Sequence, residues 1–306
     1  MSGRRLPIGV FDSGVGGLTV LRALRLALPT DDFIYLGDTA RLPYGTKSPA
    51  TVVRYSLQCA AALIARDIRC LVVACNTASA SALAALRLQY PSLPVIGVIE
   101  PGAAAAVAAS RTQHIAVIAT EGTIGGGAYQ DAIRRLNANA RVTPCACSLF
   151  VAMAEEGWTS GPIAAAVAHR YLDPIFGLGG APDTLVLGCT HFPVLAEAIR
   201  SVLPPAVQIV DSAATTAAAV LRQLQAADRA APTTGAAPTT GAAPTTGVAP
   251  TTGAAPTTGA VPSTGARRAA GRVTWLATDG AARFARVGTT FLGETLHAAD
   301  IEIIDL

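Results

Sequence analysis

Two cysteines of this chain each follow a short apolar run and precede small polar residues. The first run is Leu71–Ala74, followed by Cys75, and the second is Leu185–Gly188, followed by Cys189. A continuous apolar run of this length is typical of a strand buried in a parallel sheet. Because ligands bind just beyond the carboxyl ends of such strands, we expect both thiols to face one substrate. Such a pair suits a reaction that removes a proton from one face of a carbon atom and adds a proton to the opposite face.

Cys75 is followed by polar residues that open a predicted helix, Asn76 and Thr77. A thiol near a helix N-terminus is expected to have a lowered pKa, because that end of the helix dipole favours the thiolate. A lone cysteine after a strand is more often only a small buried residue. The second copy of the pattern at Cys189 favours a chemical role for both thiols.

Cys189 is followed by Thr190 and His191. An imidazole is a suitable proton acceptor for a thiol near neutral pH. One carboxylate of Glu155-Glu156 is a candidate to orient this imidazole, although adjacent carboxylates before a glycine more often mark an exposed helix end. The remaining cysteines have no such neighbours and are interpreted as structural: Cys59, Cys70, Cys145 and Cys147.

The glycine-rich segment Asp12-Ser13-Gly14-Val15-Gly16-Gly17 follows the first predicted strand and opens a helix. Such turns often bind phosphate through backbone N–H groups, but a carboxylate at the start of the segment would repel phosphate. Two interpretations stay open. The N–H groups bind a carboxylate substrate, or Asp12 or Ser13 simply caps the helix.

A second loop, Asp38–Gly45, follows the next predicted strand. Its proline and glycine are typical of a loop with a fixed shape. Tyr44 and Gly45 are candidates to offer a hydroxyl and a backbone N–H group to a ligand. Alternatively, Tyr44 packs in a turn and Asp38 is a buried structural carboxylate.

Apolar runs that favour strands alternate with longer helical patterns along the chain. The expected strands are Leu6–Phe11, Phe33–Gly37, Cys70–Ala74, Val95–Val98, His114–Ala119, Val142–Cys145, Thr184–Leu187, Val207–Val210 and Val273–Ala277. Helical patterns cover about 16–28, 49–67, 77–89, 123–137, 148–178 and 193–203. This alternation predicts parallel sheets with helices on both faces. The two cysteine-ended strands predict two such α/β units that meet at a shared cleft.

The length of 306 residues suits two domains. We expect a discontinuous first domain of residues 1–98 plus 212–306 and a second domain of residues 99–211. Residues 230–268 form a low-complexity insert, in which Pro-Thr-Thr-Gly-Ala-Ala recurs with a six-residue period. This segment has too few large apolar side chains to offset the entropy of ordering, so we interpret it as a flexible linker rather than a binding segment or a solenoid.

Composition excludes several classes of function. The net charge is +3 without a basic stripe, so no direct nucleic-acid binding is expected. No apolar stretch approaches the roughly 18 residues that span a bilayer, and no secretory signal is present, so we expect no membrane partner and a cytoplasmic location. The six cysteines form neither a disulfide framework nor a zinc-binding pattern. Lys47 is the only lysine and lies in a loop, which disfavours a pyridoxal Schiff base.

Four segments together resemble the glutamate racemase family, which belongs to the aspartate/glutamate racemase superfamily. They are Gly9–Leu18, Asp38–Gly45, Ala74–Ser79 and Leu187–Pro193. The resemblance runs from about residue 7 to 211 and resumes after the insert at about 272. It implies two doubly wound, mostly parallel α/β domains with the active site in the cleft between them. It also implies a homodimer and a cofactor-independent racemase that interconverts L- and D-glutamate and supplies D-glutamate for peptidoglycan.

The resemblance also implies a role for each matched residue. Cys75 and Cys189 are the acid/base residues on opposite faces of the substrate α-carbon. Asp12 assists Cys75, His191 assists Cys189, and Glu155 matches the carboxylate beside that imidazole better than Glu156 does. The residues that hold the substrate carboxylates and ammonium are Asp12, Ser13, Tyr44, Gly45, Asn76, Thr77, Thr190 and His191. No metal and no cofactor are implied.

Three other functions stay open at this point. The nearest is a racemase of the same superfamily that acts on aspartate or a hydantoin. The second is a thiol hydrolase with Cys189 and His191 as nucleophile and base, for which Cys75 is dispensable. The third is a non-catalytic binder of a protein partner, since some relatives in the family inhibit DNA gyrase.

Overall fold

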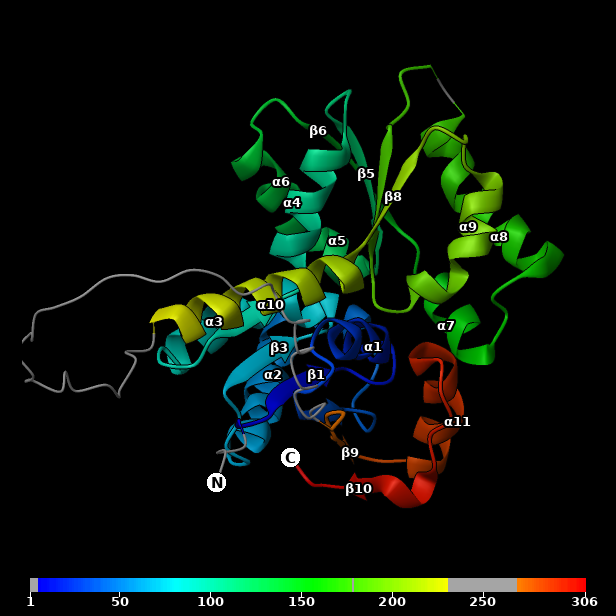
Figure 1. Cartoon of the computed structure of the whole chain (residues 1–306). Coiled ribbons are helices and arrows are strands. Elements are labelled where there is room, and N and C mark those ends of the chain that lie inside the picture. The colour runs from blue at the N-terminus through cyan, green and yellow to red at the C-terminus, as the bar shows by residue number, and fades with distance from the viewer. Residues whose placement is uncertain (1–4, 178, 231–268) are drawn as a thin grey trace, which may run out of the picture.

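The computed structural model describes residues 5–177, 179–230 and 269–306 (Figure 1). The insert predicted over residues 230–268 lies outside the described residues, apart from Ala230 at the end of a helix. The described strands all pair in parallel and form one six-stranded and one four-stranded sheet. The predicted fold class, two doubly wound α/β domains, is confirmed.

The six-stranded sheet collects strands from both ends of the chain, in the order β10-β9-β2-β1-β3-β4. Its strands are β1 Ile8–Asp12, β2 Phe33–Gly37, β3 Cys70–Val73, β4 Val95–Gly97, β9 Val273–Ala277 and β10 Ile301–Ile303. The four-stranded sheet has the order β6-β5-β7-β8. Its strands are β5 His114–Ala119, β6 Arg141–Ala146, β7 Thr184–Gly188 and β8 Gln208–Asp211. The predicted domain boundaries after residues 98 and 211 stay a prediction.

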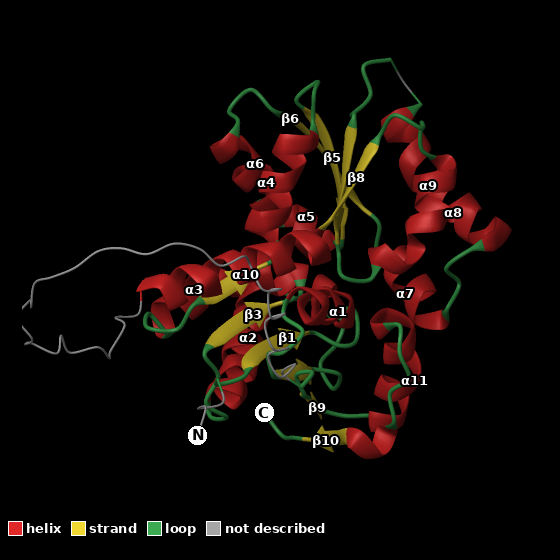
Figure 2. Cartoon of the chain, viewed as in Figure 1, coloured by secondary structure: helices red, strands yellow, loops and turns green. Residues whose placement is uncertain are grey.

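Helices lie on both sides of each sheet (Figure 2). They are α1 Leu18–Ala27, α2 Pro49–Ile64, α3 Asn76–Gln89, α4 Ile99–Ala109, α5 Glu121–Gly125, α6 Ala128–Leu136, α7 Leu149–Glu156, α8 Gly161–Phe176, α9 Ala196–Val202, α10 Ser212–Ala230 and α11 Ala281–Leu292. Short 3₁₀ turns are η1 Tyr44–Thr46, η2 Phe192–Leu195 and η3 Ala298–Asp300. Among the described residues, no helix is both long and apolar enough to cross a bilayer.

The central strands of the six-stranded sheet are buried on both faces, which explains their continuous apolar sequence. Alternate side chains enter different cores. Val10 and Val72 pack on one face, with residues of α1, α10 and α11. Phe11 and Val73 pack on the other face, with residues of α2 and α3. The first of these cores continues into the four-stranded domain, so one apolar region joins the two domains.

Several elements differ from the sequence prediction. The helical region expected over residues 148–178 consists of two helices, α7 and α8, because Gly157 adopts a left-handed conformation at φ 78° and ends the first. Neither α4 nor α11 was predicted as a helix, and β10 was not predicted as a strand.

Each sheet has one point at which the strand order reverses, and ligands bind at such points in open α/β sheets. In the six-stranded sheet, β1 lies between β2 and β3, so this point lies between the ends of β1 and β3. In the four-stranded sheet, β5 lies between β6 and β7, so it lies between the ends of β5 and β7. Asp12 and Cys75 lie at the first point. Thr120 and Cys189 lie at the second.

Candidate active site

Cys75 caps the N-terminus of α3, directly beyond the end of β3. Its Sγ accepts a hydrogen bond from the Ala78 N–H at 3.5 Å. The thiol also donates to Ser13 Oγ at 3.7 Å, which connects it to the loop after β1. The thiol is therefore held by groups of a single domain.

Burial raises the pKa of Cys75 to about 12, and the nearby Asp12 carboxylate raises it further. The Ala78 N–H and Ser13 lower this pKa but do not compensate for burial. The lowered pKa expected from the helix N-terminus is therefore wrong for this thiol. Desolvation penalises the thiolate more than the helix dipole stabilises it.

Asp12 ends β1 and is completely buried. Its Oδ2 accepts a hydrogen bond from the Gly14 N–H at 2.9 Å, and its Oδ1 has no partner among the described residues. Burial raises the pKa of Asp12, whereas the positive charge on His191 and neighbouring N–H groups lower it. The capping hypothesis is wrong, because α1 begins only after Gly17 and no side chain caps it.

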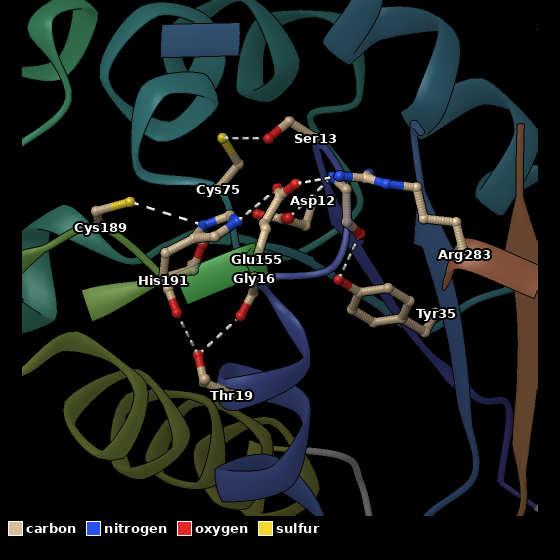
Figure 3. Close-up of polar contacts among 12 residues, drawn as sticks. Asp12, Ser13, Gly16, Thr19, Tyr35, Cys75, Glu155, Cys189, His191 and Arg283 are labelled. Atoms are coloured by element: carbon tan, nitrogen blue, oxygen red, sulfur yellow. Dashed lines mark hydrogen bonds and ion pairs between the residues drawn. The ribbon is translucent and has the colours of Figure 1, made fainter. Parts of the chain in front are cut away.

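Cys189 lies directly beyond β7 and begins a chain of contacts through His191. Cys189 Sγ lies 3.9 Å from His191 Nδ1, and His191 Nε2 lies 3.1 Å from Glu155 Oε1. Glu155 comes from the last turn of α7, and its Oε2 accepts a hydrogen bond from Arg283 Nη2 at 2.7 Å. Figure 3 shows this chain beside Asp12 and Cys75.

His191 and Glu155 shift each other's protonation. Burial alone would lower the pKa of His191, but its hydrogen bonds with Cys189 and Glu155 raise it to about 10. Burial alone would raise the pKa of Glu155, but His191 and Arg283 lower it. An imidazolium paired with a carboxylate is therefore the stable state at neutral pH.

The second predicted loop is held by a buried carboxylate. The Tyr44 hydroxyl donates to Asp38, which also accepts hydrogen bonds from Arg41 Nε and Thr278 Oγ1. Burial raises the pKa of Tyr44, so its hydroxyl stays protonated. The sequence had suggested that this hydroxyl is offered to a ligand. Because its proton is given to Asp38, the hydroxyl is not free to donate to one. Gly45 packs against Thr120 so closely that an added Cβ would lie 2.7 Å from Thr120 Cβ.

The other predicted binding residues lie where the two domains meet. Asn76 can donate to the Gly188 carbonyl and accept from the Thr190 N–H, both at 3.3 Å, when its amide is oriented to satisfy both groups. The Thr77 hydroxyl lies 3.0 Å from that of Thr120. These contacts join the ends of β3, β5 and β7.

One cavity collects these residues. It is lined by Ser13, Gly14, Leu42, Pro43, Tyr44, Gly45, Cys75, Asn76, Thr77, Thr120, Val151, Glu155, Cys189, Thr190 and His191. Of the predicted site residues, only Asp12 does not line the cavity. The cavity can therefore present two thiols from different domains, with hydroxyl, amide and imidazole groups, to one small molecule.

Comparison with known proteins identifies the family. A model described as Asp/Glu/Hydantoin racemase matches residues 15–220. The chain is 54% identical over 227 residues to the glutamate racemase of Geobacter metallireducens, which covers 74% of this chain and 83% of that protein. The chain belongs to the Asp/Glu/Hydantoin racemase family. The predicted family resemblance is thus confirmed.

Two further relatives of this racemase-family chain match over its whole length. The glutamate racemase of Koribacter versatilis is 44% identical over 310 residues, which cover 100% of this chain and 99% of that protein. The crystal structure of glutamate racemase from Francisella tularensis in complex with D-glutamate has a TM-score of 0.79 and 32% identity. It covers 99% of this chain and 98% of that chain.

Sequence reasoning missed several residues of the racemase-family site. Thr120 follows the apolar strand β5 as Cys189 follows β7, so its place beyond a strand end was an available signal. Val151 lines the cavity from α7, beside the helix end that carries Glu155. Arg283 gave no comparable signal, because its partner Glu155 lies 128 residues away in the sequence.

Proposed function

We propose that this protein is a cofactor-independent glutamate racemase that interconverts the two enantiomers by proton transfer at the α-carbon through two cysteines. The observation that carries the proposal is the pair of thiols, Cys75 and Cys189, at the strand-order reversals of two different sheets and in one cavity. The names of the relatives support glutamate as the substrate, and the related Francisella tularensis enzyme was crystallised with D-glutamate.

The reaction needs one thiolate and one thiol. The thiolate takes the α-proton, and the electron pair of the broken C–H bond stays on the α-carbon and its carboxylate. The opposite thiol then gives its proton to the other face of that carbon. The enantiomer is formed, and the two sulfurs have exchanged protonation states. Proton exchange with water restores the starting state.

The surroundings of the two sulfurs suit different starting states. Burial and Asp12 raise the pKa of Cys75 to about 12, so this residue starts as the thiol. Cys189 lies beside His191, whose pKa is raised to about 10 despite burial, and an imidazolium stabilises negative charge on a nearby sulfur. We propose that His191 assists Cys189 when Cys189 removes the α-proton of one enantiomer.

Neutral donors would hold the substrate. Among the described residues, no arginine or lysine lines the cavity. The hydroxyl and amide groups of Ser13, Asn76, Thr77 and Thr190 are therefore proposed to bind the charged groups of glutamate. In a site without bulk water, such preoriented donors stabilise charge that develops in the transition state. Asp12 is proposed to act from behind the cavity wall on Cys75.

The cavity has a volume of only about 40 Å³, so entry of a substrate implies motion between the domains. We propose that the six-stranded domain moves as one body against the four-stranded domain to admit substrate. The D-glutamate formed is proposed to supply peptidoglycan synthesis in the cytoplasm, where a reducing environment keeps the thiols free. The homodimer implied by the resemblance stays a prediction, to be tested by light scattering.

Racemisation is tested by circular dichroism with purified protein and no added cofactor. L-Glutamate and D-glutamate, incubated separately, are both expected to lose their signal completely, whereas L-aspartate and a chiral hydantoin keep theirs. Loss of signal with aspartate or the hydantoin alone would overturn the proposed substrate. No change with glutamate, aspartate or the hydantoin would contradict racemase activity and favour a binding function.

A further inference from the structure

Helix α11 contacts the Cys189 side of the site from the other domain. Arg283, in its first turn, donates through Nη2 to Glu155 Oε2 at 2.7 Å. The second oxygen of the same carboxylate, Oε1, lies 3.1 Å from His191 Nε2 (Figure 3). Glu155 therefore connects an arginine of the six-stranded domain to the imidazole of the four-stranded domain.

The same helix packs directly on the imidazole. The ring of Phe291 meets the ring of His191 edge-on, with centroids 5.0 Å apart and an angle of 73°. Phe291 is fully buried and lies on the same stripe of α11 as Arg283, two turns later. Helix α11 thus touches the Cys189–His191–Glu155 chain at both of its last two members.

We propose that Arg283 is a positioning residue that completes the Cys189 side of the site when the two domains meet. The inference rests on the proposed function. A carboxylate with one bonded oxygen can rotate about its last torsion, whereas a carboxylate bonded through both oxygens has a fixed plane. Arg283 occupies Oε2 and so fixes Oε1 toward His191, which in turn faces Cys189 Sγ.

No equivalent dependence exists for Cys75 among the contacts described. Its hydrogen-bond partners, Ser13 and the Ala78 N–H, belong to its own domain. Loss of Arg283 should therefore slow proton transfer at Cys189 and leave proton transfer at Cys75 unchanged. Because both cysteines act in each direction, this selectivity has a measurable consequence.

The test compares Arg283→Ala with Arg283→Lys and with Arg286→Ala. Arg286 is an exposed arginine one turn later in α11 and makes no ion pair with any described residue. Arg283→Ala is expected to lower kcat/KM by about tenfold. This is the lower end of the effect of losing a hydrogen bond to a charged group, because Arg283 is half exposed and water weakens its ion pair. The loss must be equal in both directions, because the equilibrium constant of racemisation is one. Arg283→Lys should recover part of it, and Arg286→Ala should match wild type.

The decisive readout is the primary isotope effect on kcat/KM with α-deuterated L- and D-glutamate. If the Cys189 step becomes slower, the isotope effect rises for the enantiomer that Cys189 deprotonates, because breaking of that C–D bond limits the rate more. It falls toward one for the other enantiomer, whose deuterium is removed by Cys75 in a step that no longer limits. A general loss of folded protein would lower activity and change neither isotope effect.

The outcomes separate this inference from the proposed function. Opposite changes of the two isotope effects in Arg283→Ala, absent in Arg286→Ala, support the positioning role. Unchanged isotope effects, or equal changes for both enantiomers, would overturn the positioning role. The proposed function would stay intact in that case, provided that the wild-type protein racemises glutamate. If Arg283→Ala does not fold, the same criteria apply to Arg283→Lys. A wild-type protein that does not racemise glutamate would instead contradict the proposed function.

Discussion

The two cysteines of the cavity are surrounded differently, although each follows a buried parallel strand. Cys75 caps a long helix and lies near a buried carboxylate, Asp12, within one domain. Cys189 precedes only a short 3₁₀ turn and lies beside an imidazole, which is held through Glu155 by the other domain. Burial is nearly complete on both sides, since each cysteine is 5% exposed.

The difference shows that equal burial does not give two thiols the same electrostatic surroundings. The Cys75 side carries a negative neighbour that opposes ionisation of its thiol. The Cys189 side carries an imidazole that is already positive at neutral pH, because its hydrogen bonds with Cys189 and Glu155 raise its pKa to about 10 despite burial. A two-base reaction needs one proton donor and one acceptor at its start, and a carboxylate beside one sulfur with an imidazole beside the other favours opposite roles for the two thiols.

The largest expected effect comes from removing either sulfur. Cys75→Ser and Cys189→Ser should each lower racemisation by at least about 10³-fold, because each removes a required acid or base. Initial rates with both enantiomers measure the loss, and far-UV circular dichroism checks the fold. Cys145→Ser is the matched control, since this half-buried thiol does not line the cavity. Near-normal turnover in either active-site variant would break the comparison.

A smaller loss is expected from crowding the Cys189 side. Gly16 lies so close to this side that an added Cβ would be 2.4 Å from both His191 Nδ1 and Thr190 Oγ1. Gly16→Ala should therefore displace the imidazole and lower kcat by about 10²-fold, the effect of misplacing a reacting group by about 1 Å. Gly125→Ala is the control, because no atom lies within 4 Å of its added Cβ. Equal activity of the two variants would contradict the packing described around His191.

A third prediction concerns stability and pH. Burial lowers the pKa of His191, but Cys189 and Glu155 raise it to about 10, above the ordinary value of about 6.5. Its stabilising contribution is therefore complete below pH about 6.5 and is lost as pH rises toward about 10. The free energy of unfolding in urea should fall between pH 6.5 and 8.5, by up to about 1.4 kcal/mol per unit.

His191→Asn should remove this slope, and His169→Asn, at an exposed histidine, should keep it. The range stops at pH 8.5 because unfolded thiols ionise above it and would add a slope of their own. Parallel profiles for wild type and His191→Asn would mean that the imidazole is not held in its charged form. The Cys75 side offers no imidazole for such a test.

The smallest expected effect comes from the insert. Deletion of residues 232–265 should leave kcat/KM and the thermal midpoint nearly unchanged, because this segment has too few large apolar side chains to add to a core and lies outside the four motifs that carry the site residues. Steady-state rates and differential scanning calorimetry measure both quantities. A large drop in either would show that the insert contributes to the site or the core.

Much of the fold was predictable because buried parallel strands are continuous apolar runs. Strands β2, β5 and β9 coincide with their predicted ranges for this reason. Helix α4 was missed because its alanine-rich sequence has little contrast between faces. Strand β10 was missed because three residues at a sheet edge give too short a pattern.

The site was predictable where function depends on short-range sequence and unpredictable where it depends on packing. Cys189 and His191 are two residues apart, so their pairing was visible in the sequence. The sign of the Cys75 pKa shift was not, because it depends on how much water the folded cavity excludes. The contact of Arg283 with Glu155 joins distant segments and required the placement of α11.

The most direct test of the account is the fate of the α-hydrogen in D2O. L-Glutamate with protium at the α-carbon is incubated with the wild-type protein, and both enantiomers are analysed by chiral separation and mass spectrometry at low conversion. Two cysteines on opposite faces predict that the D-glutamate formed carries α-deuterium, while the remaining L-glutamate keeps protium. D-Glutamate that retains the original protium would mean that one base serves both faces, and would contradict the division of labour between Cys75 and Cys189.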